Sequence, residues 1–463
     1  MTQEELDIIL AKKPSDIVKD LQVTSYTVPK WSDLEKQYDP SKHSINDTSI
    51  YPPKLNNNQQ DDFKRTALAL QKLAVNRVAQ SMFSVPVERK FNTPDANDAT
   101  ADAADAFEEV YRTENYIDSE NIERAKSLNK ACQIATVWSV LERESKIKDQ
   151  ASKFTLVHNT YSEPDGYKLY PVADQYGTLL VISISYTDQS KKEHFDVYVN
   201  GEQPKYLALI KEAEWVKNED LSNDKLEVFP VVYTHLPEPV WGGDDGTNLV
   251  EQLEEMESYQ GLYIKRNALP TFTLDYGETE GQTKSTTTET ADDARRIIKV
   301  GKGGNMTDVT WDGAGEAVND RYKRIRNSFF EQIQVPDTSF ANMIASNTSA
   351  ENKELIFADA KAKARDLGGR WERMFLQEVK IVSEFMKIMF PSYANALETM
   401  AIRSVIRPYS IRTKKENAEY VALAGDSMSL ETKVKQLDEV DNIQAEVDRI
   451  EEENRTNANQ GVL

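Results

Sequence analysis

The alternation of hydrophobic and polar positions divides the first half of the chain into three parts. Residues 1–60 are polar and rich in proline, which predicts short helices and extended arms rather than a core. Amphipathic helices are predicted over 61–84 and 119–142. Residues 152–235 instead hold short apolar runs between glycines, a pattern typical of an antiparallel sheet or meander. The apolar face of the first helix would comprise Phe63, Ala67, Leu70, Ala74 and Val78.

The middle of the chain combines long helices with a small β segment. Helical periodicity predicts amphipathic helices over 247–268 and 314–334. Between them, strand-like pieces at 271–277 and 295–301 enclose a polar run. This order predicts a β excursion inserted between two helices.

The last third begins with a loop and continues as helix. Residues 337–349 form a polar segment without glycine or proline, and a loop of that length inside a compact domain is usually functional. A very long helix is predicted over 349–390, with a kink at Gly368 and Gly369. Two acidic helices are predicted to begin near Ser429 and Asp441.

Composition adds a charge constraint. Hydrophobic residues make up 39% of the chain and charged residues 29%, as in ordinary soluble proteins. The net charge of −21 disfavours tight binding of duplex DNA, which needs clustered Lys and Arg. Two interpretations stay open: a surface charged for solubility, and a protein that lets a polyanion pass without gripping it.

Other bulk features indicate synthesis in the cytoplasm. The single cysteine, Cys132, excludes an intramolecular disulfide and a Cys-rich metal site. It lies in the predicted helix 119–142, an apolar context that predicts an inert buried thiol. No apolar run is long enough to span a membrane, and the acidic start of the chain lacks the features of a secretory signal.

The sequence offers little for catalysis. A phosphate loop is absent, and VGKGGN at 300–305 fits a strand-to-loop turn better than a phosphate site. The four histidines have no metal-ligand spacing, so neither a metal nor a cofactor is expected. Carboxylates are abundant, which leaves a carboxylate-based hydrolase as an alternative without a defined site.

A basic cluster occupies the helix 314–334. Its members lie on more than one helical face, so they do not form a single DNA-binding stripe. Pairing with the acidic helix 247–268, in the same or a neighbouring chain, is the preferred interpretation. The cluster comprises Arg321, Lys323, Arg324 and Arg326.

The order of elements resembles the portal proteins of tailed bacteriophages, particularly those of long-tailed phages. Three stretches carry the resemblance: LAVNRVAQSMFSVPVERKF at 73–91, the segment 301–340 with its VPD turn, and 406–453 with SLETK and VDRIEEE. The long helix starts with SNTSA, where the family usually has a glycine after the serine. The alternative is another helical scaffold or adaptor protein of the virion.

The resemblance implies an α+β portal-type fold. Its parts would be a mixed α/β wing, a two-helix stem, a small β-containing clip, a long kinked helix and a helical crown. The expected divisions are an N-terminal arm at 1–60, wing at 61–246, stem helix at 247–269, clip at 270–312, second stem helix at 313–336, channel loop at 337–349, long helix and return to the wing at 350–410, and crown at 411–463.

The resemblance also implies a function and partners. Copies would form a ring, typically of twelve subunits, at one capsid vertex, through which double-stranded DNA enters and leaves. The ring would contact the major capsid or scaffolding protein, the terminase packaging motor and a head–tail adaptor. The protein would not be an enzyme.

Particular residues follow from this assignment. The channel loop would expose Ser339, Phe340, Asn342, Met343, Ile344, Ser346, Asn347 and Thr348. The clip would bind partners through Glu278, Thr279, Glu280, Gln282 and Lys284. Contacts between subunits in the stem would involve Glu254, Glu257, Arg321 and Arg324.

Overall fold

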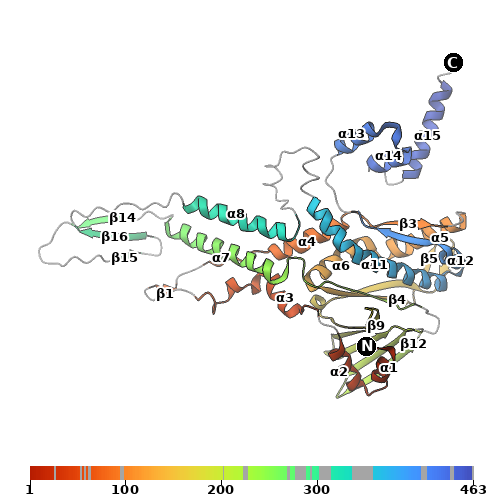
Figure 1. Cartoon of the computed structure of the whole chain (residues 1–463), viewed down its shortest axis with the longest axis horizontal. Helices are drawn as coiled ribbons and strands as arrows, with labels where there is room; N and C mark the ends of the chain where they lie inside the picture. The colour runs from red at the N-terminus through yellow and green to blue at the C-terminus, as the bar shows by residue number, and fades with distance from the viewer. Residues whose placement is uncertain are drawn as a thin grey trace.

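The fold is a mixed α+β body from which a helical hairpin projects to one side (Figure 1). A β-module with two short helices lies on one side of the body, and the C-terminal helices lie on the other. The computed structural model describes residues 1–25, 28–52, 55–56, 59–60, 64–93, 98–201, 203–222, 228–267, 272–276, 288–291, 295–301, 314–335, 358–407, 414–437 and 443–460.

The centre of the body is a helical core. The helix α11 (Ala358–Met389) packs against α4 (Leu70–Phe83), while α6 (Ile117–Ala131) packs against α4 as well. Apolar residues recur along α11 at helical spacing, so one face is buried over almost its whole length. Aromatic pairs tie the helices together, with the rings of Phe83 and Trp371 4.8 Å apart.

The predicted helix over 61–84 is wrong at its start. Residues 64–69 are not helical, and α4 begins at Leu70. The backbone N–H groups of Thr66 and Leu68 donate instead to side chains of a distant helix, Ser258 and Glu254. The first N–H groups of a helix have no partner within that helix. Here two N–H groups ahead of α4 instead have partners on the distant helix.

A second correction concerns the predicted helix over 119–142. The helix α6 ends at Ala131, and Cys132 follows in the left-handed conformation with φ of 62°. The chain then continues as strand β4 (Gln133–Leu141), which pairs with β7 (Thr155–Tyr161) and β13 (Val231–His235). Cys132 is therefore buried at a helix end and not in a helix interior.

The strand-rich stretch predicted over 152–235 is confirmed. Its main sheet is antiparallel in the order β12-β11-β10-β9-β8. The turns at Gly166 and Gly177 use positive φ, which glycine adopts without steric cost. The strands are β8 (Lys168–Ala173), β9 (Leu179–Thr187), β10 (Glu193–Val199), β11 (Lys205–Lys211) and β12 (Trp215–Ser222).

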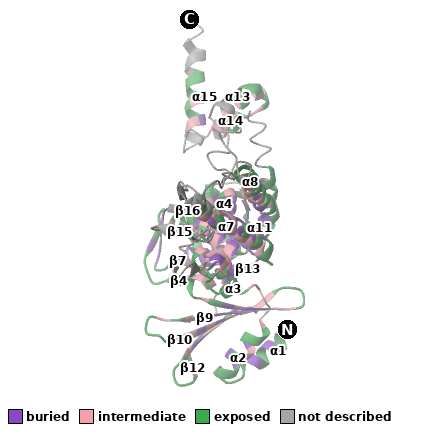
Figure 2. Cartoon of the chain, turned by 90° about the vertical axis from the view of Figure 1, so that its left-hand side faces the viewer, coloured by how far each residue is buried: buried purple, intermediate pink, exposed green. Residues whose placement is uncertain are grey.

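The N-terminal segment was expected to lack a core, and this expectation is wrong. The helices α1 (Gln3–Leu10) and α2 (Pro14–Thr24) bury apolar side chains against one face of the five-stranded sheet (Figure 2). The other face packs on β4 and β13 through Ile182 and Ile184 of β9. Because side chains alternate along a strand, one strand serves both cores.

The helical hairpin consists of α7 (Gly243–Asn267) and α8 (Ala314–Gln332), which pack side by side. Both helices confirm the predictions for this part of the chain. Beyond their outer ends lies a sheet in which β16 pairs parallel to β14 and antiparallel to β15. Its strands are β14 (Phe272–Tyr276), β15 (Thr288–Ala291) and β16 (Arg295–Gly301).

The remaining elements cover the body and form the C-terminal part. Within the described residues, α11 runs through Gly368 and Gly369 as one helix, and the predicted start of this helix at 349 lies outside them. The acidic helices predicted near the C-terminus are confirmed as α14 and α15. The helical elements are α3 (Trp31–Tyr38), η1 (Pro40–Lys42), η2 (Ser44–Asn46), α5 (Asp98–Glu108), the π-helical turn η3 (Glu109–Glu114), η4 (Glu163–Asp165), η5 (Pro391–Tyr393), α12 (Ala394–Thr399), α13 (Lys414–Ala424), η6 (Gly425–Ser427), α14 (Leu430–Leu437) and α15 (Ile443–Gln460). The remaining strands are β1 (Leu55–Asn56), β2 (Gln59–Gln60), β3 (Glu88–Asn92), β5 (Ser145–Ile147), β6 (Gln150–Ser152) and β17 (Ala401–Val405).

Candidate functional site: the helical hairpin and its anchoring network

The hairpin leaves the body through a tight turn. Gly242 and Gly243 have φ of +80° and +57°, in the left-handed region that favours glycine. Gly246 lies so close to the preceding backbone that a Cβ there would be 1.7 Å from the carbonyl oxygen of Trp241. Two aspartates in the first turn of α7 add negative charge at the positive end of the helix dipole. The turn therefore fixes the direction in which α7 leaves the body.

A buried histidine–carboxylate contact joins the N-terminal segment to the side of α7. His43 Nδ1 lies 2.6 Å from Glu254 Oε1, and the same oxygen accepts the N–H of Leu68 at 2.6 Å. His43 Nε2 lies 2.8 Å from the carbonyl oxygen of Gln37. Both ring nitrogens thus face oxygen atoms, one on α7 and one in the N-terminal segment, so the imidazole links the two.

Further contacts clamp the base of the hairpin. The side chain of Gln37 donates to Asp244 at 2.7 Å and accepts from the indole of Trp241 at 3.0 Å. Tyr38 packs on the same indole, with ring centroids 5.9 Å apart. At the base of α8, the guanidinium of Arg77 lies over the ring of buried Phe330, 4.8 Å from its centroid. The body therefore holds both helices of the hairpin at the same end.

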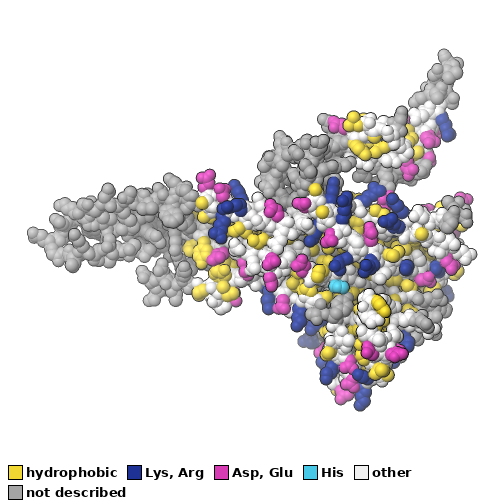
Figure 3. Space-filling model, viewed as in Figure 1, with side chains coloured by type: hydrophobic (Ala, Val, Ile, Leu, Met, Phe, Trp, Pro, Cys, Tyr) yellow, Lys and Arg dark blue, Asp and Glu magenta, His cyan; other side chains and the backbone are white. Residues whose placement is uncertain are grey.

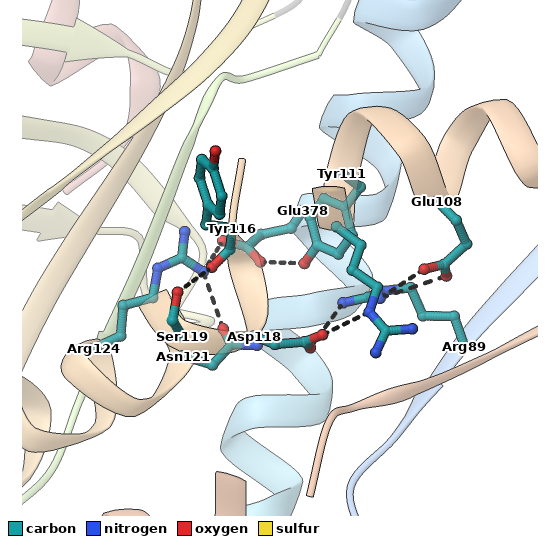
Figure 4. A network of polar contacts seen from close by, with 10 residues as sticks. Arg89, Glu108, Tyr111, Tyr116, Asp118, Ser119, Asn121, Arg124 and Glu378 are labelled. Carbon is teal, nitrogen blue, oxygen red and sulfur yellow. Dashed lines mark hydrogen bonds and ion pairs between the residues drawn. The ribbon is translucent and has the colours of Figure 1, made fainter. Parts of the chain in front are cut away.

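A network of buried charges anchors α11 to the helices beside it (Figure 4). Arg124 Nη1 donates to Glu378 Oε1 at 2.9 Å, and the hydroxyl of Tyr111 donates to Glu378 Oε2 at 2.6 Å. Arg124 and Glu378 are 1% and 0% exposed. Burial and the neighbouring carboxylate raise the pKa of Tyr111 well above its usual range, so its hydroxyl keeps the proton that it donates.

A second ion-pair group extends this network to β3. Arg89 pairs with Glu108 at 3.1 Å, and its guanidinium lies 4.4 Å from the ring centroid of Tyr111. Asp118 accepts from Arg112 at 2.7 Å and lies 4.0 Å from Arg89. Burial raises the pKa of Glu108, although Arg89 opposes the shift. Because the charges come from β3, α5, the π-helical turn and α6, the network locks these elements in one arrangement.

The sequence did not predict this network. Its partners are far apart in the chain, with Tyr111 and Glu378 separated by 267 positions. One signal was present: Glu378 lies inside the apolar stripe of α11, between Phe375 and Val382. A carboxylate at such a position requires a buried partner, although the sequence does not identify which one.

The stem residues expected between subunits occupy different environments. Arg321 and Arg324 are exposed on α8, and Glu257 on α7 is partly exposed. Glu254 is fully buried and contacts His43 and Leu68 of its own chain. A role for Glu254 at a subunit surface does not fit these contacts, because its carboxylate is already enclosed.

The other predicted site residues lie outside the part whose side chains the structure describes. This applies to the channel-loop residues Ser339, Phe340, Asn342, Met343, Ile344, Ser346, Asn347 and Thr348. It applies equally to the clip residues Glu278, Thr279, Glu280, Gln282 and Lys284. Their assignments stay predictions.

The described residues offer no obvious reactive centre. Burial raises the pKa of the Cys132 thiol to about 12, which keeps it protonated. Burial, and secondarily Arg124, lowers the pKa of His158 to about 3. Among the described residues, no three His, Cys, Asp or Glu side chains lie together as metal ligands would. No helix formed by the described residues is long and apolar enough to cross a membrane.

Together, these elements define an α+β protein with a helical projection that side-chain contacts hold at its base. Comparison with protein families identifies the group: the family described as phage portal protein, SPP1 Gp6-like, matches residues 24–460. The chain therefore belongs to this portal family, which confirms the resemblance seen in the sequence. Comparison with curated proteins gives no match. The family is structural and non-enzymatic, and its members form the ring through which phage DNA is packaged and ejected.

Proposed function

We propose that twelve copies of this chain form a closed ring at one capsid vertex and that duplex DNA passes through its central channel. The family match over nearly the whole chain is the observation that carries this proposal. A ring of identical copies needs heterologous contacts, in which unlike faces of neighbouring subunits meet. The projecting hairpin, with its exposed charges, supplies surfaces of this kind.

In this proposal the parts of the chain have distinct tasks. The helices α7 and α8 form the stem, the sheet β14-β16-β15 belongs to the clip, and the body with its β-module forms the wing. Helices α13, α14 and α15 form the crown. The clip and outer surfaces contact the packaging motor, the head–tail adaptor and the capsid or scaffolding protein. The chain hydrolyses nothing itself and needs no cofactor.

The residues 337–349 form the channel loop in this proposal. Their polar side chains would face DNA without fixed positive charge, which lets the phosphate backbone slide. Substitution of Asn342, Met343 or Asn347 by alanine is expected to reduce DNA packaging or retention and to leave rings intact in electron micrographs. Loss of the rings would instead assign these residues to a subunit interface.

The segment 278–287 carries the proposed partner-binding residues of the clip. Replacing Glu278, Thr279, Glu280, Gln282 and Lys284 together by alanine changes no residue of the strands β14, β15 and β16. Rings are expected to form normally, while binding to the packaging motor or the head–tail adaptor weakens in a pull-down assay. Unchanged binding to both would refute the clip assignment.

Exposed arginines of α8 are proposed to pair across the stem interface. Arg321→Glu with Arg324→Glu should weaken ring assembly, and Glu257→Lys in the same chain should restore part of it. Mass photometry over a concentration series measures the effect. Assembly equal to that of the unsubstituted chain in the arginine double variant would refute the pairing.

A further inference from the structure

A groove of about 640 Å³ lies between α11, β13 and the β8–β9 turn. Arg370, Arg373 and Lys380 line it from α11. Their spacings of three and seven residues place all three cations on one face of the helix. Each of the three is exposed, so their charges face the groove's solvent rather than the core.

The charge of the groove is opposite to that of the chain. The chain has 77 acidic against 56 basic residues, yet none of the described residues lining the groove is Asp or Glu. Arg370 donates to the carbonyl oxygen of His235 at 2.9 Å. Neither Arg373 nor Lys380 forms an ion pair with a described carboxylate. The groove therefore presents two cations that described side chains of this chain leave uncompensated.

The rest of the lining is suited to protein side chains. Met374 and Ile381 form an apolar floor beside the cations, and Tyr176 stands at the rim. A groove with an apolar floor beside two cations suits protein side chains, whereas duplex DNA needs a positive surface along its backbone. The overall charge of −21 also repels DNA. These properties favour an acidic protein segment over nucleic acid.

The position of the groove indicates which protein brings that segment. The view down the shortest axis of the chain shows its broad face, and Lys and Arg side chains gather over α11 on this face (Figure 3). In a ring of identical copies, unlike faces of neighbouring copies meet, and the broad face with the groove is available for such a contact. The next copy has a net charge of −21, which complements the cations of the groove.

We propose that this groove receives acidic side chains from the neighbouring copy of the chain, and that Arg373 and Lys380 hold them. The inference rests on the proposed ring. It assigns α11 a role in assembly as well as in the core. Arg370 already donates a hydrogen bond to the backbone carbonyl of His235. The test therefore substitutes Arg373 and Lys380 and leaves Arg370 unchanged.

The first test reverses these charges. The double variant Arg373→Glu with Lys380→Glu should raise the concentration for half-maximal ring assembly by at least about tenfold, because like charges then face each other across the interface. The neutral double variant Arg373→Gln with Lys380→Gln should show a smaller increase and covers the case in which charge reversal disturbs folding. Circular dichroism checks that both variants are folded.

The matched control is Lys13→Glu with Lys19→Glu, which changes the net charge equally. Both lysines are exposed on the α1–α2 segment, outside the family match. The control should assemble like the unsubstituted chain. If both groove variants also assemble like that chain, the inference is wrong. If both groove variants assemble normally but retain a short DNA duplex less well, the groove binds nucleic acid, and the inference is also wrong.

A second test locates the occupant directly. Gln377 is exposed on α11 and lines the groove, and the chain's own Cys132 is buried, so Gln377→Cys provides one reactive site for a photo-cross-linker. Rings assembled from a mixture of ¹⁴N- and ¹⁵N-labelled chains should give cross-links between chains, at peptides rich in Asp and Glu. Cross-links confined to one chain would refute the inference. Absence of rings from the unsubstituted chain would overturn the proposed function, and this inference with it.

Discussion

The buried pair of Arg124 and Glu378 provides a quantitative test of how α11 is anchored. Glu378→Gln removes the carboxylate charge and leaves the Arg124 guanidinium buried at 1% exposure without its counter-charge. Loss of one partner of such a pair costs about 3–5 kcal/mol, because the remaining charge is desolvated and unpaired. The Tyr111 hydroxyl also loses its charged acceptor at 2.6 Å.

This cost translates into a measurable change in melting temperature. Unfolding entropies of about 2.1 cal/mol/K per residue give roughly 1 kcal/mol/K for a chain of 463 residues that unfolds as one unit. Glu378→Gln should therefore lower the melting temperature by about 3–5 °C in differential scanning calorimetry. Arg124→Met should have an effect of similar size, because it leaves Glu378 as the buried unpaired charge.

The double variant Arg124→Met with Glu378→Gln separates a true pair from two independent sites. It should lose less stability than the sum of the single variants, by at least about 1.5 kcal/mol, since no unpaired charge remains. Lys211→Met is the control: Lys211 pairs with Glu193 on the surface, both about half exposed, and the change should cost no more than about 1 kcal/mol. Additive effects of the two buried substitutions, within about 0.5 kcal/mol, would refute the pairing.

Three further predictions concern the hairpin turn and two buried side chains. Gly246→Ala should destabilise the fold strongly in thermal unfolding, because the added Cβ would be 1.7 Å from the carbonyl oxygen of Trp241. The control is Gly261→Ala on the same helix, where the added Cβ meets nothing within 4 Å. This control should be neutral or stabilising by up to about 1 kcal/mol. The pKa of His158 is lowered to about 3, so its contribution to stability is complete above its unfolded pKa of about 6.5 and is lost as pH falls from there toward 3. Between pH 7.5 and 5.5 the unsubstituted chain should therefore lose about 1.4 kcal/mol more than His158→Phe does, and equal losses in denaturant titrations would contradict the assignment. The Cys132 thiol, with its pKa raised to about 12, should not react with a thiol reagent at pH 8 until denaturant is added; rapid reaction of the native protein would show that the site is open.

Predictions from the sequence succeeded where helical periodicity was long and uninterrupted. The helices α7 and α8 and the acidic C-terminal helices were predicted because their apolar positions recur at 3.6-residue spacing or follow capping residues. The strands on either side of the β excursion were predicted from their β-branched and aromatic content. The order of these elements also carried the resemblance to portal proteins, which the family match confirmed.

The errors have identifiable physical causes. Strand β4 is buried on both faces over most of its length, so it lacks the polar alternation that separates a strand from a helix. At the junction of β4 with α6, Cys132 adopts the left-handed conformation that glycine usually adopts at a helix end. The sequence therefore lacks the glycine that would indicate where α6 ends. The N-terminal helices form a core only with strands more than 150 positions later, and local patterns contain no information about such distant contacts.

The roles assigned to the stem residues stay predictions. Arg321 and Arg324 are exposed on α8, whereas Glu254 is buried. Its carboxylate is enclosed by His43 and Leu68, which are distant from α7 in the sequence. Periodicity specifies the face of a helix, but the fold determines what covers that face.

The central claim is that copies of this chain form a ring with an open channel. Electron microscopy of the purified full-length chain over a range of concentrations tests it most directly. We predict closed rings of twelve subunits with a central hole, which become less abundant at high salt because charged interfaces are screened. Particles that remain single chains at every concentration and salt level would contradict the account.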